Sequence, residues 1–187
     1  MHAKVRRLSV WAGIGVLLAG CMKQPKTENI ENVRVCLPLE QMMLYPEHLQ
    51  DTIHAPKYKY VVYVDSAECS SCKIIHMGIW NYYRNELQDR KVGFYMILCP
   101  EKEKRQTIMD AYDAYRQRIP IYIDTLGMFR RDNPEIAAMP EEYHCFLLDE
   151  DNRVVIVGDA SKDYFARERI FQFLSERADS TSNEERP

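Results

Sequence analysis

The chain has 187 residues, of which 46% are hydrophobic and 28% are charged. This composition excludes a disordered or fibrous protein, and the length favours one globular domain with short appendages. The formal net charge is −3. Residues 1–20 hold three basic and no acidic residues, so the rest of the chain has 22 basic residues against 28 acidic ones, a net charge of −6. This balance gives no indication of nucleic-acid binding.

The amino terminus has a basic segment followed by a short apolar one. Residues 4–7 (KVRR) are basic, and residues 8–18 are apolar but fall short of the roughly 20 residues that a transmembrane helix needs. The sequence Leu-Ala-Gly-Cys at 18–21 then resembles the end of a lipoprotein signal peptide. The resemblance implies removal of residues 1–20, a lipid on Cys21 that anchors the protein to a membrane, and a periplasm-facing location in the bacterial cell envelope.

The segment after the leader carries weaker signals. Residues 22–32 (MKQPKTENIEN) are polar and lack apolar periodicity, so we expect residues 21–32 to be a flexible tether. Residues 33–39 alternate well enough to predict a short strand, and Pro38 is typical of an edge position. Residues 40–56 fit either a turn or a short helix that covers the core.

A C-x-x-C pair lies where a predicted strand meets a predicted helix. Lys59–Val64 is an apolar, β-branched run typical of a central strand, and Lys73–Arg90 has helical spacing without proline. Cys69 and Cys72 therefore lie in the first helical turn, where unpaired N–H groups favour a thiolate. We expect Cys69 to attack a disulfide and Cys72, one turn inward, to resolve the mixed disulfide without metal or cofactor. The expected buried face of the helix consists of Ile75, Ile79, Tyr82 or Tyr83, and Leu87.

The remaining pattern alternates strands with helices and ends in a hairpin. A loop of four polar residues, Asp149–Asn152, joins its two strands, which must therefore be antiparallel. Apolar spacing predicts inward faces at Ile108, Tyr112 and Tyr115 in one helix, and at Phe165, Ile170, Phe173 and Leu174 in the last. The predicted elements are a strand at 92–98, a helix at 101–118, a strand at 119–124, a helical turn at 128–131, strands at 143–148 and 153–157, a helix at 163–177 and a disordered tail at 178–187.

This order of elements resembles the thioredoxin fold, an α/β fold with three layers in which helices flank a central mixed sheet, and in particular the membrane-anchored TlpA-type thiol:disulfide oxidoreductases. The motifs that carry the resemblance are Val61-Val-Tyr-Val64 before Cys69-Ser-Ser-Cys72, Met139-Pro140, Phe146–Asp149 and Val154–Gly158. It implies a thioredoxin-like domain over residues 33–177. It also implies a cis-proline that faces the C-x-x-C, so that Met139 and Pro140 position a substrate, and a reductive role toward an exported protein.

Four further residues are candidate modulators of the pair. The carboxylate of Glu68 would raise the pKa of Cys69 and so oppose the helix end, and Lys73 is a candidate for proton transfer with Cys72. Cys99 ends one predicted strand and Cys145 begins another, so both reach the edge that holds the pair. With strands ~4.8 Å apart, these two lie too far from each other for a direct bond, and both are typical of small buried apolar residues.

Two alternative functions use the same residues. Cys69, Cys72 and His76 share one helix face, and with Cys99 or Cys145 they would form a soft copper site. Alternatively, the chain is a non-catalytic lipoprotein adaptor with a structural Cys69–Cys72 bond. Export favours redox chemistry, because disulfides persist outside the cytoplasm, and the five cysteines other than Cys21 leave at least one free thiol.

Overall fold

The computed structural model describes residues 30–49 and 56–184, with the backbone alone for 178–184. Its centre is one mixed sheet with the strand order β1-β4-β3-β2-β5-β6. Strands β2, β3 and β4 run parallel, whereas β1, β5 and β6 pair antiparallel with their neighbours. The strands are β1 (Met43–Tyr45), β2 (Tyr58–Val64), β3 (Val92–Leu98), β4 (Ile121–Ile123), β5 (Cys145–Leu148) and β6 (Val154–Val157).

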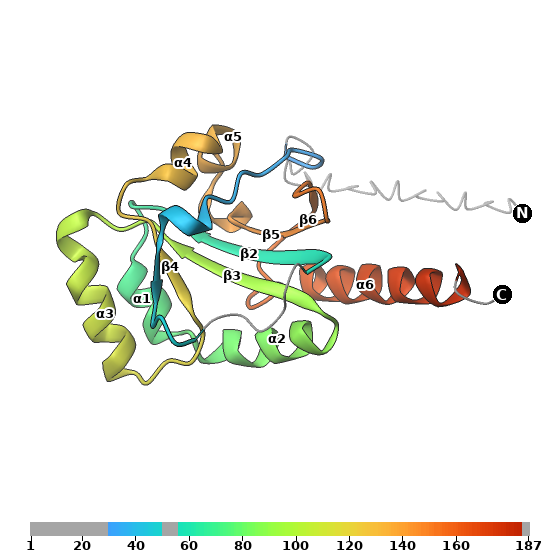
Figure 1. The fold of residues 1–187 in the computed structure, drawn as a ribbon, viewed down its shortest axis with the longest axis horizontal. Coiled ribbons are helices and arrows are strands. Elements are labelled where there is room, and N and C mark those ends of the chain that lie inside the picture. Colours follow the sequence, from blue (N-terminus) through green and yellow to red (C-terminus); the bar gives the residue numbers. More distant parts are fainter. Residues whose placement is uncertain (1–29, 50–55, 185–187) are drawn as a thin grey trace, which may run out of the picture.

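Helices cover both faces of the sheet and make three layers (Figure 1). One face is covered by α1, α2, α3 and α6, and the other by α4, α5 and the segment that begins at Ile30. The helices are η2 (Leu39–Gln41), α1 (Ser70–Ile75), α2 (Gly78–Asp89), η3 (Lys102–Lys104), α3 (Arg105–Ala114), α4 (Met128–Asp132), α5 (Pro134–Ala137), η4 (Glu141–Tyr143) and α6 (Tyr164–Glu184). Among the described residues, none of the helices is both long and apolar enough to cross a bilayer.

Alternation along the central strands explains the two cores. Tyr60 and Val62 of β2 pack on the side of α1, α2, α3 and α6, whereas Val61 and Tyr63 pack on the side of α4 and α5. All seven residues of β3 are buried. These strands are apolar on both faces because both faces are covered, as the sequence predicts.

The strand order determines which residues meet at the edge of the sheet that holds the cysteine pair. The parallel strands β2, β3 and β4 end at the same edge, and α1 begins there after β2 (Figure 1). Strand β5 is antiparallel to β2 with Val62 opposite Cys145, so β5 begins at the same edge. The expectation that Cys99 and Cys145 both reach this edge is therefore confirmed.

The predicted helix over Lys73–Arg90 is in fact two helices. The first, α1, ends at Ile75, and the second, α2, begins at Gly78. Of the positions expected on the buried face, Tyr83 and Leu87 are buried, whereas Ile75 and Ile79, on either side of the break, are exposed. The buried residues of the second helix are Trp80, Tyr83 and Leu87.

The amino-terminal segment also differs from expectation. Instead of a strand at 33–39, the backbone makes one isolated bridge, between Arg34 and Arg153. The Val35 amide still donates to the Asn152 carbonyl, but the Cys36 amide donates to the Asn133 side chain, so the pairing with the β6 side of the sheet ends there. Strand β1, at one edge of the sheet, instead lies within residues 40–56, where the sequence indicated a turn or a short helix. Ile30 is buried, so the tether predicted for 21–32 ends earlier, while the signal peptide at 1–20 and Cys21 lie outside the described residues.

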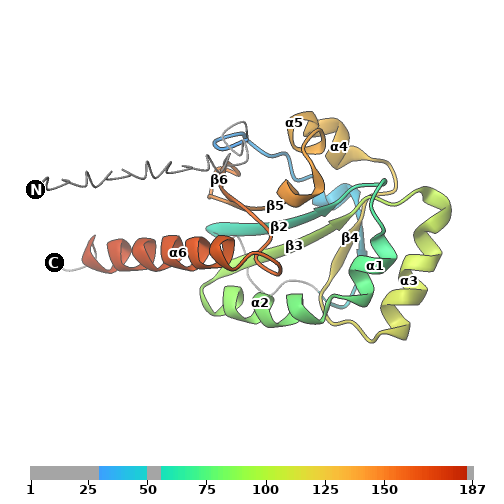
Figure 2. The ribbon, with the colours of Figure 1, turned by 180° about the vertical axis from the view of Figure 1, so that it is seen from behind.

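Two helix predictions need correction at their ends. Helix α3 ends at Ala114, before the predicted end, and Tyr115 is exposed. Helix α6 continues past Arg177 to Glu184, so most of the predicted tail is helical, and Figure 2 shows its last turns projecting away from the domain. Its inward residues are Ala166, Ile170 and Leu174, whereas Phe165 is 76% exposed.

Candidate redox site

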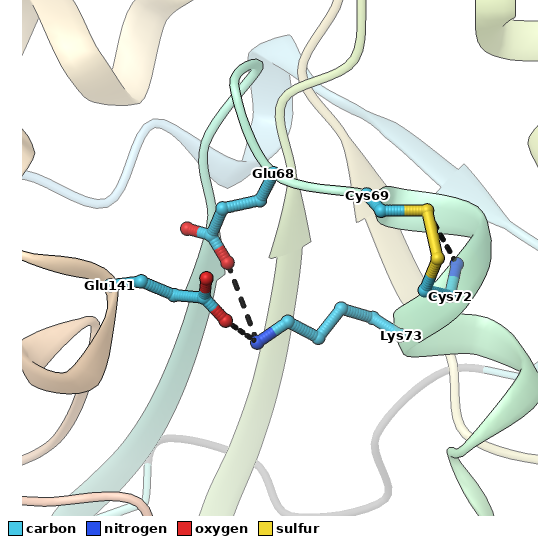
Figure 3. Close-up of a disulfide and its surroundings, with 5 residues drawn as sticks. All are labelled: Glu68, Cys69, Cys72, Lys73 and Glu141. Atoms are coloured by element: carbon cyan, nitrogen blue, oxygen red, sulfur yellow. Dashed lines mark hydrogen bonds and ion pairs between the residues drawn. A yellow bond between two sulfur atoms is a disulfide. The ribbon is translucent and has the colours of Figure 1, made fainter.

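Cys69 and Cys72 form a disulfide at the start of α1, with their Cα atoms 5.2 Å apart. Cys69 is the N-cap residue of this helix, and the Cys72 amide donates a hydrogen bond to its Sγ at 3.2 Å (Figure 3). An N–H group that points at this sulfur stabilises a thiolate there once the disulfide opens. The predicted place of the pair, between a strand and a helix, is confirmed.

The turn before the pair is held by Asp65. Its Oδ1 accepts hydrogen bonds from the Ala67 amide and the Ser66 hydroxyl, and its Oδ2 accepts one from the Tyr63 hydroxyl at 2.6 Å. Burial favours the neutral acid, but these bonds and the charge of Arg130 outweigh it, so the pKa of Asp65 lies below its usual value. The carboxylate therefore fixes the path of the chain into Cys69.

Both cysteines are exposed, which contradicts the expectation that Cys72 lies inward. Helix α1 buries Ser70 and Ile74 against the domain, so the positions between them face outward. The two cysteines line separate hollows. The hollow at Cys69 includes Ser66, Pro100 and Thr107, and the one at Cys72 includes His76, Ile79, Trp80 and Lys162. The disulfide is therefore accessible from two sides.

Lys73 links the first helical turn to the loop before β5. Its Nζ lies 2.7 Å from Glu141 Oε1 and 3.4 Å from Glu68 Oε2, and Figure 3 shows this side chain directed away from the disulfide. Burial lowers the pKa of Lys73, but the bond to Glu141 and the charge of Glu68 outweigh burial and raise it. The Lys73 hydrogen bond in turn lowers the pKa of Glu141. The prediction that Lys73 transfers a proton with Cys72 remains untested.

Glu68 is anchored by a histidine that the sequence did not single out. His144 Nδ1 lies 2.9 Å from Glu68 Oε1, and the His144 Nε2–H donates to the Met139 carbonyl at 2.9 Å. The side chains of Glu68 and His144 are 7% and 5% exposed. The register Val62 opposite Cys145 places residue 144 beside Tyr63, whose amide donates to the His144 carbonyl. The contact between His144 and Glu68 therefore follows from strand pairing, and no local sequence motif indicates it.

The expected cis-proline is not at Met139–Pro140. That peptide bond is trans, and the cis peptide bond among the described residues joins Tyr45 to Pro46. Pro140 instead precedes η4, whose Glu141 meets Lys73. The residue directly before β5 is His144.

Cys99 and Cys145 are free and buried, as predicted, and they do not bond to each other. Cys145 belongs to the core under α1, α2, α3 and α6, and Cys99 to the core on the opposite face. Burial and the nearby Asp124 raise the pKa of Cys99 to about 12, and burial raises that of Cys145 well above its usual value. Neither thiol is therefore a ready nucleophile.

The arrangement gives little support to a soft-metal site. Within residues 30–49 and 56–184, no group of three or more His, Cys, Asp or Glu side chains is placed to hold a metal ion. The proposed ligands Cys69 and Cys72 are joined to each other, and Cys36, a further free thiol of the described part of the chain, is exposed. Cys99 donates instead to Asp124 Oδ2 at 3.7 Å, on the other face of the sheet from Cys145.

No protein-family model and no curated protein matches the chain in sequence. Among solved structures, an oxidized thioredoxin-like protein is 15% identical over 79% of this chain and 95% of that chain, with a TM-score of 0.49. The thioredoxin domain of a thiol-disulfide oxidoreductase from Bacteroides vulgatus is 12% identical, covering 64% and 81%, with a TM-score of 0.46. A putative thiol:disulfide interchange protein DsbE from Chlorobium tepidum is 16% identical, covering 64% and 82%, with a TM-score of 0.46.

The order and direction of the strands identify the fold. Strand β2, which leads into the C-x-x-C, is central in the sheet. Its parallel partner β3 follows after the crossover helices and lies on one side of β2. The antiparallel hairpin β5–β6, which precedes the last helix, lies on the other side. Helices lie on both faces, and the disulfide lies at the carboxyl end of β2. The chain has a thioredoxin-like α/β fold with a Cys69–Cys72 disulfide at the carboxyl end of β2.

Proposed function

We propose that this protein is a thiol–disulfide oxidoreductase that uses Cys69 and Cys72. The observation that carries the proposal is the exposed disulfide at the start of α1, in which the Cys72 amide donates to Cys69 Sγ. A structural role is a poor explanation of this bond, because a bridge across so short a loop constrains little of the unfolded chain. Its exposure supports access by another protein.

The reductive half-reaction uses the cysteines in sequence. The Cys69 thiolate attacks one sulfur of a substrate disulfide, whose S–S bond breaks and releases one substrate thiolate. Cys72, as a thiolate, then attacks the Cys69 sulfur, so that the Cys69–Cys72 bond forms and the second substrate thiolate leaves. Two electrons have passed from the cysteine pair to the substrate. Protonation of the released thiolates by water completes the balance.

The biological setting belongs to the same proposal. The leader sequence supports a lipid on Cys21, and with it a membrane-anchored protein that faces the periplasm and acts on an exported protein. The resemblance to TlpA-type proteins favours reduction of that partner over its oxidation. Determination of the mature amino terminus by mass spectrometry tests the anchor, and an intact Leu18–Cys21 segment in the exported protein would contradict it.

We further propose that the loop from Met139 to His144 borders the bound substrate. The support is its contact with the site: Glu141 meets Lys73 of α1, and His144 meets Glu68 beside Cys69. A substrate backbone that crosses the disulfide would then run along Met139 and Pro140. Met139→Ala should raise KM for a disulfide peptide more than it lowers kcat. An unchanged KM would count against this placement.

Trapping of a mixed disulfide tests the exchange mechanism. In a Cys72→Ser variant the intermediate at Cys69 has no resolving thiol, so a disulfide-containing peptide should accumulate on Cys69, as read by mass spectrometry. Cys69→Ser is the matched variant, because its remaining thiol lacks the N-cap position and should form the adduct more slowly. Cys36→Ser serves as the control and should leave turnover intact. Adducts on Cys36 alone would contradict the proposed function.

A further inference from the structure

The ring of His144 is fully engaged at both nitrogens. Nε2 faces the Met139 carbonyl at 2.9 Å, and a carbonyl can only accept, so Nε2 carries a proton. Nδ1 faces Glu68 Oε1 at 2.9 Å, and a hydrogen bond at this distance needs one proton between the two atoms. The pair is therefore either imidazolium with carboxylate or neutral imidazole with carboxylic acid.

The surroundings of Glu68 favour the charged form of the pair. Its Oε1 also accepts the Asp65 amide at 3.0 Å, and its Oε2 lies 3.4 Å from the Lys73 ammonium. A carboxyl group that receives donors from two sides at one oxygen and faces a cation with the other is better satisfied as a carboxylate. His144 then carries the matching positive charge, inside the domain and away from water.

Both members of the pair are held rigidly next to the nucleophile. Glu68 directly precedes Cys69 in the chain, and its amide donates to the Asp65 carbonyl at 3.0 Å. The His144 ring packs on Tyr63 with ring centroids 5.0 Å apart, and its carbonyl accepts the Tyr63 amide at 2.9 Å. Strand β2 therefore fixes the histidine in front of the carboxylate.

We propose that His144 is a positioning residue of the exchange reaction, whose imidazolium neutralises Glu68 and thereby keeps Cys69 available as a thiolate at neutral pH. Lys73 and Glu141 complete the group, in which two positive and two negative charges balance. Loss of the imidazolium leaves a net negative charge beside Cys69, which opposes a second negative charge on its sulfur. This role rests on the proposed function, because it concerns the reactivity of the same thiol.

Other charged groups around the pair stay the same in the test. From the loop before α6, Lys162 lies 3.9 Å from Glu141 and 3.6 Å from Asp159. On the opposite side, Arg130 lies 3.5 Å from Asp65. Cys145, whose thiol is buried, is the first residue of β5 and directly follows His144. Among the described residues, the hydrogen-bond partner of His144 Nδ1 is Glu68, so a change at this ring isolates its contribution.

The test is the pH dependence of Cys69 alkylation by iodoacetamide in the reduced full chain, located by peptide mass spectrometry. His144→Gln should move the midpoint to higher pH, with a rate about three to ten times lower on the acidic side of the profile. The matched variants are Glu68→Gln and Glu68→Gln/His144→Gln, in which no unbalanced carboxylate remains. Both should keep the wild-type midpoint or lie below it. A purely structural histidine would not show this dependence on Glu68.

Two results would overturn the inference: an unchanged midpoint in His144→Gln, or a raised midpoint that persists in the double variant. If His144→Gln fails to fold, 15N NMR of the wild type decides, because the charged pair requires two protonated ring nitrogens on His144 at pH 7. A single protonated nitrogen would refute it. Alkylation of Cys69 needs no substrate protein. If the protein did not exchange disulfides, the proposed function would fall, but the effect of His144 on Cys69 could still be measured.

Discussion

Lys73→Met should cost far more stability than its exposure indicates, because Lys73 joins two carboxylates in different environments. The Glu141 side chain is 52% exposed, so its pair with Lys73 is worth about 0.5 kcal/mol. The Glu68 side chain is 7% exposed, and its Oε2 makes no hydrogen bond to any described residue. Removing one partner of a buried charge costs about 3–5 kcal/mol, which His144 on the other oxygen reduces to about 2 kcal/mol. The expected total at pH 7 is about 2.5 kcal/mol.

Urea unfolding of the oxidised full chain at pH 7 measures this cost. Glu141→Gln is the control for the exposed pair and should cost about 0.5 kcal/mol. Adding Glu68→Gln to Lys73→Met removes the stranded charge and should recover more than half of the loss, a coupling that a double-mutant cycle reads directly. Equal costs for Lys73→Met and Glu141→Gln, or no recovery in the double variant, would refute the assignment of the energy to the buried pair.

Three further predictions concern acid stability, thiol reactivity and glycine positions. Because the pKa of Asp65 is lowered, its carboxylate stabilises the fold above the usual pKa of an Asp, and this stabilisation is lost as the pH falls through its lowered pKa. Asp65→Asn should therefore cost about 1–2 kcal/mol of unfolding free energy at pH 7 and flatten the acid limb of a stability–pH curve. An unchanged acid limb would contradict this. Under native conditions at pH 8, iodoacetamide should label the exposed Cys36 at least a hundred times faster than Cys99, whose pKa is about 12. Comparable labelling rates would refute the burial of Cys99. Gly158→Ala should lose about 2 kcal/mol or more in denaturant melts, because a Cβ there meets the Ala166 Cβ at 2.5 Å and φ is +150°, whereas Gly78→Ala, with open space around it, should gain about 0.5 kcal/mol; the opposite order would contradict the packing.

The central strands and the place of the cysteine pair were predictable because their signals are local and strong. The run Lys59–Val64 is apolar on both faces, and this pattern requires a strand covered on both sides. The run at 92–98 has the same property, and the prediction matched its bounds. Four polar residues between two apolar runs also sufficed for the hairpin.

The errors arise where tertiary packing overrides a local pattern. The apolar spacing indicates one buried face from Ile75 onward, but the chain forms two helices, and Trp80 is buried in place of Ile79. Cys72 was expected inward because it lies one turn along the helix, yet Ser70 and Ile74 occupy the inner face of α1. Neither result can be read from the spacing alone, since both depend on where the axis of each helix lies.

The Glu68–His144 pair shows a second limit. The sequence identified Glu68 as a carboxylate that would oppose the Cys69 thiolate, and it gave no reason to connect it with a histidine 76 positions away. Only the antiparallel register of β2 with β5 brings the two together. A modulator predicted as unfavourable is therefore compensated by a residue that strand pairing alone supplies.

The most direct test of the central claim is the equilibrium of the Cys69–Cys72 pair with glutathione. The full chain carrying Cys21→Ser and Cys36→Ser is equilibrated with varied ratios of reduced to oxidised glutathione, alkylated, and read by mass shift. We expect a reversible two-electron transition confined to Cys69 and Cys72, whose midpoint gives the thermodynamically favoured direction of exchange. A pair that stays oxidised at every accessible ratio, or that never closes, would contradict an exchange function.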